Sequence, residues 1–439
     1  MEPSGVMTLL REANPVTTFG KVSKVVGLVA EGGGLKAPLG ALCHIVPEGS
    51  TADASGIPVE VVGFRDGKLL FMPYGDLRGI QPGSLIRNSS LPPVFPVGGA
   101  LLGRAFDAFG APLDETSGPL ATGDVKPLYA NPPGPLSRPR ITEPLDVGVR
   151  SVNSLLTLGK GQRVGIMAGS GVGKSTLMGM MARYTKADVN VIGLVGERGR
   201  EVVEFMEKDL GPEGLARSVL IVATSDQSPL IRMRAAYAAT AVAEYFRDQG
   251  KDVLLMMDSV TRFAMAAREV GLAVGEPPTT RGYTPSVFAQ LPKLLERAGR
   301  SARGTITGIY TVLVDGDDFN EPVADSVRSI LDGHIVLTRE LADQGHFPAI
   351  DVLRSISRLR TDICPAAVIK AGQAVSGNLA TFKRVEDMVN IGAYVRGSSP
   401  DIDRAIDMLP AINTFLRQDI ADPQPLEDSY AQLQALAAS

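Results

Sequence analysis

Residues 163–176 hold the side chains whose types and spacing could do chemistry. Their sequence is R-V-G-I-M-A-G-S-G-V-G-K-S-T. A short apolar run, typical of a buried strand, leads into a glycine-rich turn, and a helix is expected from Lys174 onward. Because glycine has no Cβ, successive backbone N–H groups can wrap a polyphosphate, whose charge also lies at the positive end of that helix. The stretch therefore predicts a phosphate-binding loop made of Ala168, Gly169, Ser170, Gly171, Val172, Gly173, Lys174, Ser175 and Thr176.

Two side chains of this loop have distinct expected tasks. Lys174 is placed to reach the β- and γ-phosphates of a bound nucleotide, and the Ser175 hydroxyl is placed to bind Mg²⁺. The pattern departs from its usual form at the first position, which is Ala168 and not glycine. Alanine is the next smallest residue, so we expect the loop to keep its shape.

Two carboxylates follow apolar strands farther along the chain. Asp258 ends the run 253–257, a position from which it could support Mg²⁺. Glu197 comes just after the run 189–195, where a carboxylate could polarise a water molecule against the γ-phosphate. The alternative for Glu197 is a solvated charge cluster over 196–201. The alternative for Asp258 is a structural carboxylate at the end of a buried strand.

The chain must fold so that these segments meet. The spacing of apolar residues along the chain changes in a definite order. Residues 1–18 carry Val6, Leu9 and Leu10 at helical spacing, which suits a docking helix or a frayed terminus. Short apolar runs punctuated by glycine and proline predict a small β-barrel over residues 19–88, with strands Lys24–Ala30, Leu42–Val46, Val59–Phe64 and Lys68–Met72.

Residues 89–365 are predicted to form the nucleotide-binding domain. Apolar strands alternate there with amphipathic helices, which favours a mainly parallel α/β sheet with helices on both faces and a ligand at the carboxyl ends of the strands. The predicted elements are strands Val189–Val195, Ser218–Ala223, Val253–Met257 and Ile306–Val314, and helix Met233–Asp248. Residues 366–439 show only helical periodicity and predict a helical C-terminal domain.

Composition narrows the classes of function. The chain has 439 residues, 44 basic and 48 acidic, so it lacks the strong positive field of a protein that wraps nucleic acid. Its two cysteines and three histidines are scattered, which argues against a zinc site or a serine–histidine triad. We find no signal segment and no run of the roughly 20 apolar residues that a membrane helix needs, and we expect a cytoplasmic protein.

Three motifs together carry a resemblance to a known family. A-G-S-G-V-G-K-S, G-E-R-G-R-E and L-L-M-M-D-S-V-T-R-F resemble the catalytic subunits of rotary ATPases and the hexameric ATPases of type III protein export. Residues 390–394 with Gly397 and Ser398, together with M-A-G-S-G-V-G-K-S and M-M-A-R-Y-T-K-A-D-V, look specifically like the flagellar export ATPases. The resemblance implies a RecA-like core, ATP and Mg²⁺, and a homohexamer. It also implies a regulator and stalk proteins, chaperone–substrate complexes, no nucleic acid, and peripheral attachment to the membrane export gate.

The resemblance also assigns tasks to individual residues. It makes Glu197 the general base, Arg198 a neighbour of the γ-phosphate, and Arg262 an arginine that helps to set the site. Phe347 matches the aromatic that stacks on adenine, with core packing as the alternative. Arg358 matches an arginine finger that reaches into the neighbouring subunit, with a basic surface cluster as the alternative. Ile420 stands where rotary relatives have a second aromatic, which predicts a looser base pocket.

Several functions stay open at this point. The flagellar export ATPase is the main interpretation, and an injectisome secretion ATPase is the nearest alternative. A ring-shaped RNA translocase shares this core but needs an RNA-binding N-terminal module, and residues 18–88 have few aromatic side chains. The presence of Glu197 argues against a non-catalytic nucleotide-binding subunit.

Overall fold

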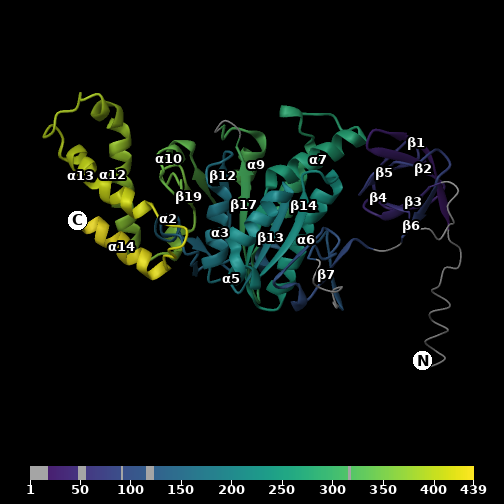
Figure 1. Cartoon of the computed structure of the whole chain (residues 1–439), viewed down its shortest axis with the longest axis horizontal. Helices are drawn as coiled ribbons and strands as arrows, with labels where there is room; N and C mark the ends of the chain where they lie inside the picture. The colour runs from purple at the N-terminus through teal and green to yellow at the C-terminus, as the bar shows by residue number, and fades with distance from the viewer. Residues whose placement is uncertain (1–17, 48–55, 90–91, 115–122, 315–317) are drawn as a thin grey trace.

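The computed structural model describes residues 18–47, 56–89, 92–114, 123–314 and 318–439. Three parts follow one another along its long axis: a barrel, a central sheet covered by helices, and a C-terminal group of helices (Figure 1). The predicted docking helix over 1–18 lies, except for its last residue, outside the described residues. Among the described residues no helix is both long and apolar enough to span a membrane.

The first part is a closed barrel of six strands in the order β1-β2-β5-β4-β3-β6. Inward-facing residues such as Val59, Val61 and Phe71 are fully buried and form its core. One predicted strand, Lys24–Ala30, is wrong: Gly27 has a φ of +57°, so the chain turns there and makes a hairpin. The strands are β1 Phe19–Val26, β2 Val29–Gly33, β3 Leu42–Val46, β4 Ile57–Arg65, β5 Lys68–Pro73 and β6 Leu85–Asn88.

The second part is a nine-stranded sheet, which runs in the order β19-β18-β12-β17-β15-β13-β14-β8, with β16 paired to β17. All neighbours are parallel except the short strands β16 and β19. The strands are β8 Arg104–Phe106, β12 Arg163–Ala168, β13 Val189–Glu197, β14 Ser218–Thr224, β15 Asp252–Asp258, β16 Gly299–Arg300, β17 Thr305–Leu313, β18 Gly333–Leu337 and β19 Ile356–Ser357.

Helices cover both faces of this sheet because its strands are apolar on both sides. On β13, Val191 and Val195 belong to one buried core and Ile192 and Leu194 to the other, as the two-residue period of a strand requires. The first core packs against α6 and α7, and the second against α3. The helices of this part are α2 Arg150–Leu155, α3 Lys174–Tyr184, α4 Gly199–Glu204, π-helix η3 Phe205–Leu210, α5 Gly211–Ala216, α6 Pro229–Asp248, α7 Val260–Val274, α8 Pro285–Leu295, α9 Pro322–Ile330, α10 Arg339–Asp343 and α11 Arg360–Ile363.

Helix α6 begins four residues before the predicted start at Met233. The Ser228 hydroxyl accepts a hydrogen bond from the Ile231 N–H at 3.4 Å, and Pro229 follows at the first helical position. The same hydroxyl donates to the Tyr74 carbonyl of the barrel at 2.9 Å. The cap of α6 therefore also ties the barrel to the central sheet.

Small elements connect the larger ones. They are strands β7 Val94–Val97, β9 Asp124–Pro127, β10 Pro144–Leu145 and β11 Leu158–Gly159, and 3-10 helices η1 Gly99–Leu101, η2 Pro135–Ser137 and η4 Thr280–Gly282.

The third part consists of helices α12 Ala366–Asn390, α13 Pro400–Leu416 and α14 Leu426–Ala438. It packs on the nucleotide-binding part mainly through α14 and α2. The helical prediction is correct, but two apolar residues that supported it, Met388 and Ile391, are 49% and 78% exposed. The predicted fold class, an α/β core between a barrel and a helical domain, is confirmed. The division of the chain at residues 88 and 365 remains a prediction.

Candidate functional site

The predicted phosphate loop joins β12 to α3 at the carboxyl end of the parallel sheet. Gly171 and Gly173 have φ values of +79° and +89°, a backbone conformation that costs little only for glycine. Ala168 still belongs to the strand and pairs with Leu313 and Leu337 on either side. Alanine is tolerated at the first position because the strand needs no left-handed residue there.

One ammonium and two carboxylates come together where this loop meets α3: Lys174, Asp258 and Glu197. The Lys174 ammonium forms a short ion pair with the Asp258 carboxylate, and it lies 3.7 Å from Glu197 Oε1. The Thr311 hydroxyl, on the neighbouring strand β17, donates to Asp258 Oδ1 at 2.6 Å. These contacts come from four separate segments, so the parallel sheet positions the cluster.

The pKa of Glu197 is shifted toward neutrality. Burial, with the Asp258 carboxylate nearby, raises the pKa of Glu197 to about 7, and the Lys174 ammonium opposes the rise. Its Oε1 atom is buried and accepts no hydrogen bond from any residue of the described part. A carboxylate with a pKa near neutrality is suited to accept a proton from water.

The site fits a magnesium ion that is shared with a nucleotide. Asp258 and Glu197 place two carboxylates beside the phosphate loop, and Ser175 lies exposed at the first turn of α3. The described residues contain no group of three or more histidine, cysteine or acidic side chains that could hold a metal alone. Mg²⁺ commonly takes one or two protein ligands and completes its shell with phosphate oxygens and water.

The structure places the two predicted site arginines differently: Arg262, expected to help set the site, packs next to the Glu197 segment, whereas Arg198, expected near the γ-phosphate, points into solvent. Gly196 has a φ of +75°, and a Cβ atom there would lie 2.9 Å from the Arg262 Cβ, so the Arg262 stem packs against Gly196, the residue before Glu197. The Arg262 Nε atom is buried and donates to no described residue. The Arg198 side chain is 74% exposed and pairs with Glu201 at 3.8 Å.

Phe347 lies at the other side of the loop. A Cβ atom on Gly173 would be 3.7 Å from its ring, yet the residue is 47% exposed, which disfavours the alternative of core packing. The Phe347 carbonyl accepts from the Gln418 N–H at 3.0 Å, which brings the segment of Ile420 alongside. Ile420 is 48% exposed. An exposed ring beside the phosphate loop can stack on a base.

Two residues that hold other residues of the site in place, Arg339 and Thr311, were not predicted from the sequence. Arg339, on α10, donates to the Ser170 carbonyl at 3.0 Å and so braces the phosphate loop. Thr311, which holds Asp258, could have been noticed as a polar residue inside the apolar strand 306–314. Arg339 left no such signal, because it is one exposed arginine among many.

Arg358 lies far from its own phosphate loop. It follows β19, whose Ser357 pairs with Gly333 at the beginning of β18, whereas the loop lies beyond the end of β12. The six residues of β12 separate the two places by roughly 17 Å. Arg358 lines a shallow cavity with Asp325, Arg328, Ser329 and His334. It is therefore not placed to act on the nucleotide of its own protomer.

Two family models match the chain. Residues 148–357 match the ATP synthase alpha/beta family, nucleotide-binding domain, and residues 364–435 match the type III secretion EscN ATPase C-terminal domain. The flagellum-specific ATP synthase of Bacillus subtilis is 53% identical over 441 residues, which cover the whole of both chains. The type 3 secretion system ATPase of Xanthomonas euvesicatoria is 50% identical over 400 residues, 91% of this chain and 90% of that protein.

Solved structures point the same way. The assembled ATPase EscN of the enteropathogenic E. coli type III secretion system is 45% identical, with a TM-score of 0.90 over 95% of this chain and all of that one. EscN in complex with its central stalk EscO gives a TM-score of 0.87 at 44% identity, again over 95% of this chain and all of that one. The chain therefore belongs to the ATP synthase alpha/beta family and, within it, to the group of flagellum-specific and type III secretion ATPases.

Proposed function

We propose that this ATPase drives flagellar type III protein export by hydrolysing Mg²⁺–ATP at sites that lie between the subunits of a homohexamer. The observation that carries the proposal is the position of Glu197, whose side chain is only 14% exposed and has a pKa of about 7, beside the Lys174–Asp258 pair. Glu197 orients and deprotonates the attacking water, while Lys174 stabilises the charge that develops on the phosphate. Mg²⁺, bound by Ser175 and supported by Asp258, would neutralise phosphate charge.

The remaining positions complete the site. The glycines of the phosphate loop, with Ser170, Val172 and Thr176, cradle the phosphates, and Phe347 stacks on adenine. Arg262 packs against Gly196 and so helps to position the Glu197 segment, and the exposed Arg198 can leave Glu201 and turn toward a bound nucleotide. Because Ile420 offers no second ring, the base pocket is expected to discriminate weakly between nucleotides.

Arg358 is proposed to act on the site of the neighbouring subunit. Its distance from its own phosphate loop leaves an interface as the place where its guanidinium can meet phosphate. Arginine is always charged and can bind two phosphate oxygens in a fixed fork. Such fingers are worth on the order of 10³-fold or more in rate.

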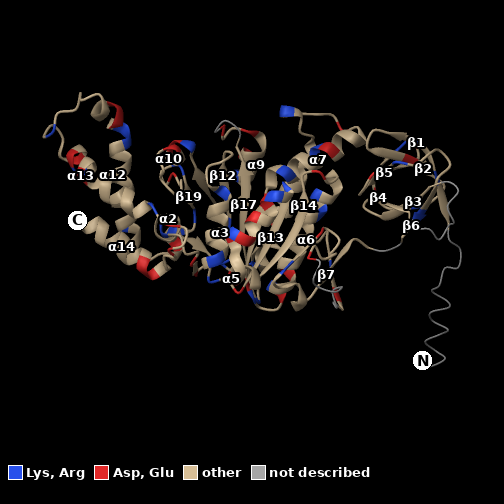
Figure 2. Cartoon of the chain, in the orientation of Figure 1, with Lys and Arg blue, Asp and Glu red and all other residues tan. Residues whose placement is uncertain are grey.

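The proposed partners follow the relatives. EscN has been solved with a central stalk, and a stalk protein is the expected partner of this ring. We also expect a regulator, bound by residues 1–18, and chaperone–substrate complexes that are delivered to the export gate. The protein would then be cytoplasmic and peripheral to the membrane. Basic and acidic residues are interspersed over the molecule (Figure 2), which disfavours an RNA translocase.

The test mixes two inactive variants. Arg358→Ala keeps its base and Glu197→Gln keeps its finger, so in a mixed ring some interfaces pair an intact Glu197 with an intact Arg358. Part of the activity should return, and activity of the unmodified protein should rise steeply with concentration. Arg354→Ala is the matched control, because Arg354 belongs to the same basic cluster but packs over the Phe319 ring. Mixed rings that form and stay inactive would contradict the proposal.

A further inference from the structure

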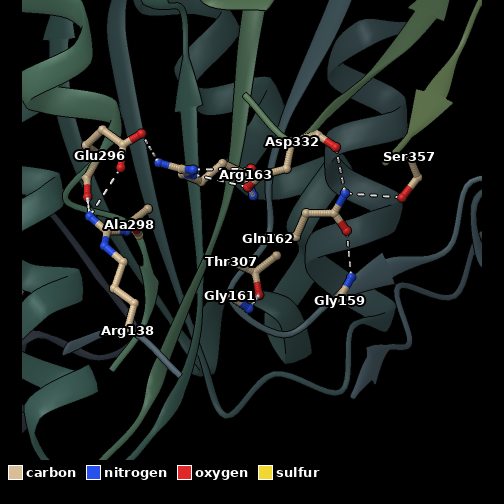
Figure 3. Close-up of polar contacts among 10 residues, drawn as sticks. All are labelled: Arg138, Gly159, Gly161, Gln162, Arg163, Glu296, Ala298, Thr307, Asp332 and Ser357. Carbon is tan, nitrogen blue, oxygen red and sulfur yellow. Dashed lines mark hydrogen bonds and ion pairs between the residues drawn. The ribbon is translucent and has the colours of Figure 1, made fainter. Parts of the chain in front are cut away.

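The side chain of Gln162 reaches from the turn before β12 to the strand that leads to Arg358 (Figure 3). Gln162 is fully buried. Its Oε1 atom accepts from the Gly159 N–H at 2.8 Å, which fixes the orientation of the amide. Its Nε2 atom donates to Ser357 Oγ at 3.1 Å and to the Asp332 carbonyl at 3.3 Å. Both hydrogen-bonding ends of this amide are therefore used.

The two acceptors of Gln162 flank the backbone of Arg358. The Arg358 N–H donates to the Asp332 carbonyl at 3.0 Å, and Ser357 immediately precedes Arg358. The Ser357 hydroxyl also donates to the Thr157 carbonyl at 2.8 Å. Strand β19, which ends at Ser357, is only two residues long and lies at the edge of the sheet. So short a strand has little pairing of its own, and these side-chain contacts hold it in place.

Asp332 is itself fixed by the first residue of β12. The Arg163 N–H and Nε each donate to Asp332 Oδ2 at 3.1 Å, and Arg163 Nη2 donates to Oδ1 at 3.2 Å. Arg163 also forms an ion pair with Glu296, which in turn pairs with Arg138 at 3.2 Å. The Asp332 side chain is thus held by Arg163, and its carbonyl is left to receive both Arg358 and Gln162.

We propose that Gln162 is a positioning residue for Arg358: it fixes the backbone from which the finger leaves one protomer to act on the next. The inference rests on the proposed role of Arg358 in trans. Gln162 makes no hydrogen bond to residues 168–176 of the phosphate loop, yet β12, which starts at the next residue, ends in that loop. Arg358, which acts on the neighbouring subunit, is therefore connected through Ser357 and Gln162 to β12, the strand that leads into the phosphate loop of its own protomer.

Three substitutions test this role. Gln162→Met keeps the length of the side chain and removes both the amide donor and the amide acceptor, and Ser357→Ala removes the hydroxyl that accepts from Gln162. Ser357→Thr is the matched control, because it keeps a hydroxyl at the same atom. Misplacing a catalytic group by about 1 Å can cost 10²-fold in rate. We expect kcat to fall about 10-fold to 100-fold in Gln162→Met and Ser357→Ala, KM for ATP to change less than about twofold, and Ser357→Thr to recover most of the rate.

A mixing experiment separates positioning in trans from damage to the variant's own loop. Every Gln162→Met protomer keeps an intact Glu197. In rings that also contain Glu197→Gln, some of these protomers receive a correctly positioned Arg358 from a Glu197→Gln neighbour. Activity should rise above the average of the two parent proteins. Ser357→Ala mixed with Glu197→Gln should behave alike, and it carries the test if Gln162→Met does not fold.

The mixture of Arg358→Ala with Glu197→Gln distinguishes the two possible failures. If this mixture forms rings and regains no activity, the proposed finger in trans is itself refuted. If it regains activity while the mixtures of folded Gln162→Met or Ser357→Ala with Glu197→Gln do not, the role of Arg358 in trans is supported and the positioning role of Gln162 is overturned. Normal kcat in both substituted proteins would overturn it as well.

Discussion

Replacement of Glu197 by glutamine tests both the chemistry and the electrostatics of the site. Burial and the Asp258 carboxylate raise the pKa of Glu197 from an ordinary value near 4.5 to about 7. Each pKa unit corresponds to about 1.4 kcal/mol, so the ionised carboxylate destabilises the nucleotide-free protein by about 3 kcal/mol. Glutamine has the same size and no charge, and it resembles the protonated acid.

The pH dependence of this effect has a definite sign. Because the pKa is raised in the folded protein, the folded state binds more protons than the unfolded state between pH 4.5 and 7. The unmodified protein therefore loses stability as the pH rises through this window, and the contribution of Glu197 to its stability is constant at higher pH. Glutamine does not titrate, so the advantage of the Glu197→Gln variant should be absent near pH 4.5 and reach about 3 kcal/mol at pH 8.

Thermal unfolding without nucleotide measures this difference. For 439 residues the unfolding entropy is about 0.9 kcal/mol/K, so at pH 8 the Glu197→Gln variant should melt about 3 °C higher than the unmodified protein. Glu213→Gln, at an exposed position on α5, is the control and should not shift the melting temperature. Equal melting temperatures at pH 8 would refute the idea that the ionised, largely buried Glu197 side chain destabilises the folded protein.

The same variant tests the catalytic assignment independently. Loss of a positioned general base should lower kcat by about 10²-fold to 10⁴-fold. A titration with fluorescent ATP should still show binding, because Lys174 and the phosphate loop are intact. The unmodified enzyme should gain activity as the pH rises through about 7, where Glu197 ionises. Near-normal turnover by the variant would show that another group orients the water.

Three further perturbations follow from the same geometry. Lys174→Ala should weaken ATP binding as well as turnover, because it removes the charge that meets the phosphates; a binding titration beside a steady-state assay separates it from Glu197→Gln. Thr311→Val keeps the shape of the side chain but removes the hydrogen bond to Asp258, and we expect kcat to fall about tenfold and the melting temperature to fall by about 1–3 °C, with unaltered kcat as the contrary result. Deletion of residues 1–18 should leave basal ATPase activity intact and abolish binding of a regulator in a pull-down assay, whereas loss of folding would assign the segment to the barrel.

Local sequence patterns predicted most of the fold because its signals are local. The strand before the phosphate loop, the glycines that need a left-handed backbone, and the end of α6 before Gly250 all depend on neighbouring residues. The error over 24–30 has the same origin: apolar residues lie on both sides of Gly27, and only the positive φ at that glycine shows that they form two strands.

The site was less accessible to sequence reasoning wherever its contacts join distant segments. Asp258 follows a recognisable strand, but nothing in its surroundings points to Thr311, 53 residues away, as its partner. The arrangement of Arg262 depends on a close approach to Gly196, which only the packing of α7 on the sheet reveals. Arg198, adjacent to Glu197 in the chain, is exposed because the backbone turns into α4 at that point.

The order of strands in the central sheet also has a consequence for synthesis of the chain. The barrel uses only residues 19–88 and can close as soon as they leave the ribosome. Strand β12, by contrast, pairs with β17 and β18, which end at Leu313 and Leu337. At roughly 5–20 residues per second, its apolar surface waits on the order of ten seconds for its neighbours. Nascent chains of this protein should therefore need a chaperone most during translation of the segment between β12 and β17.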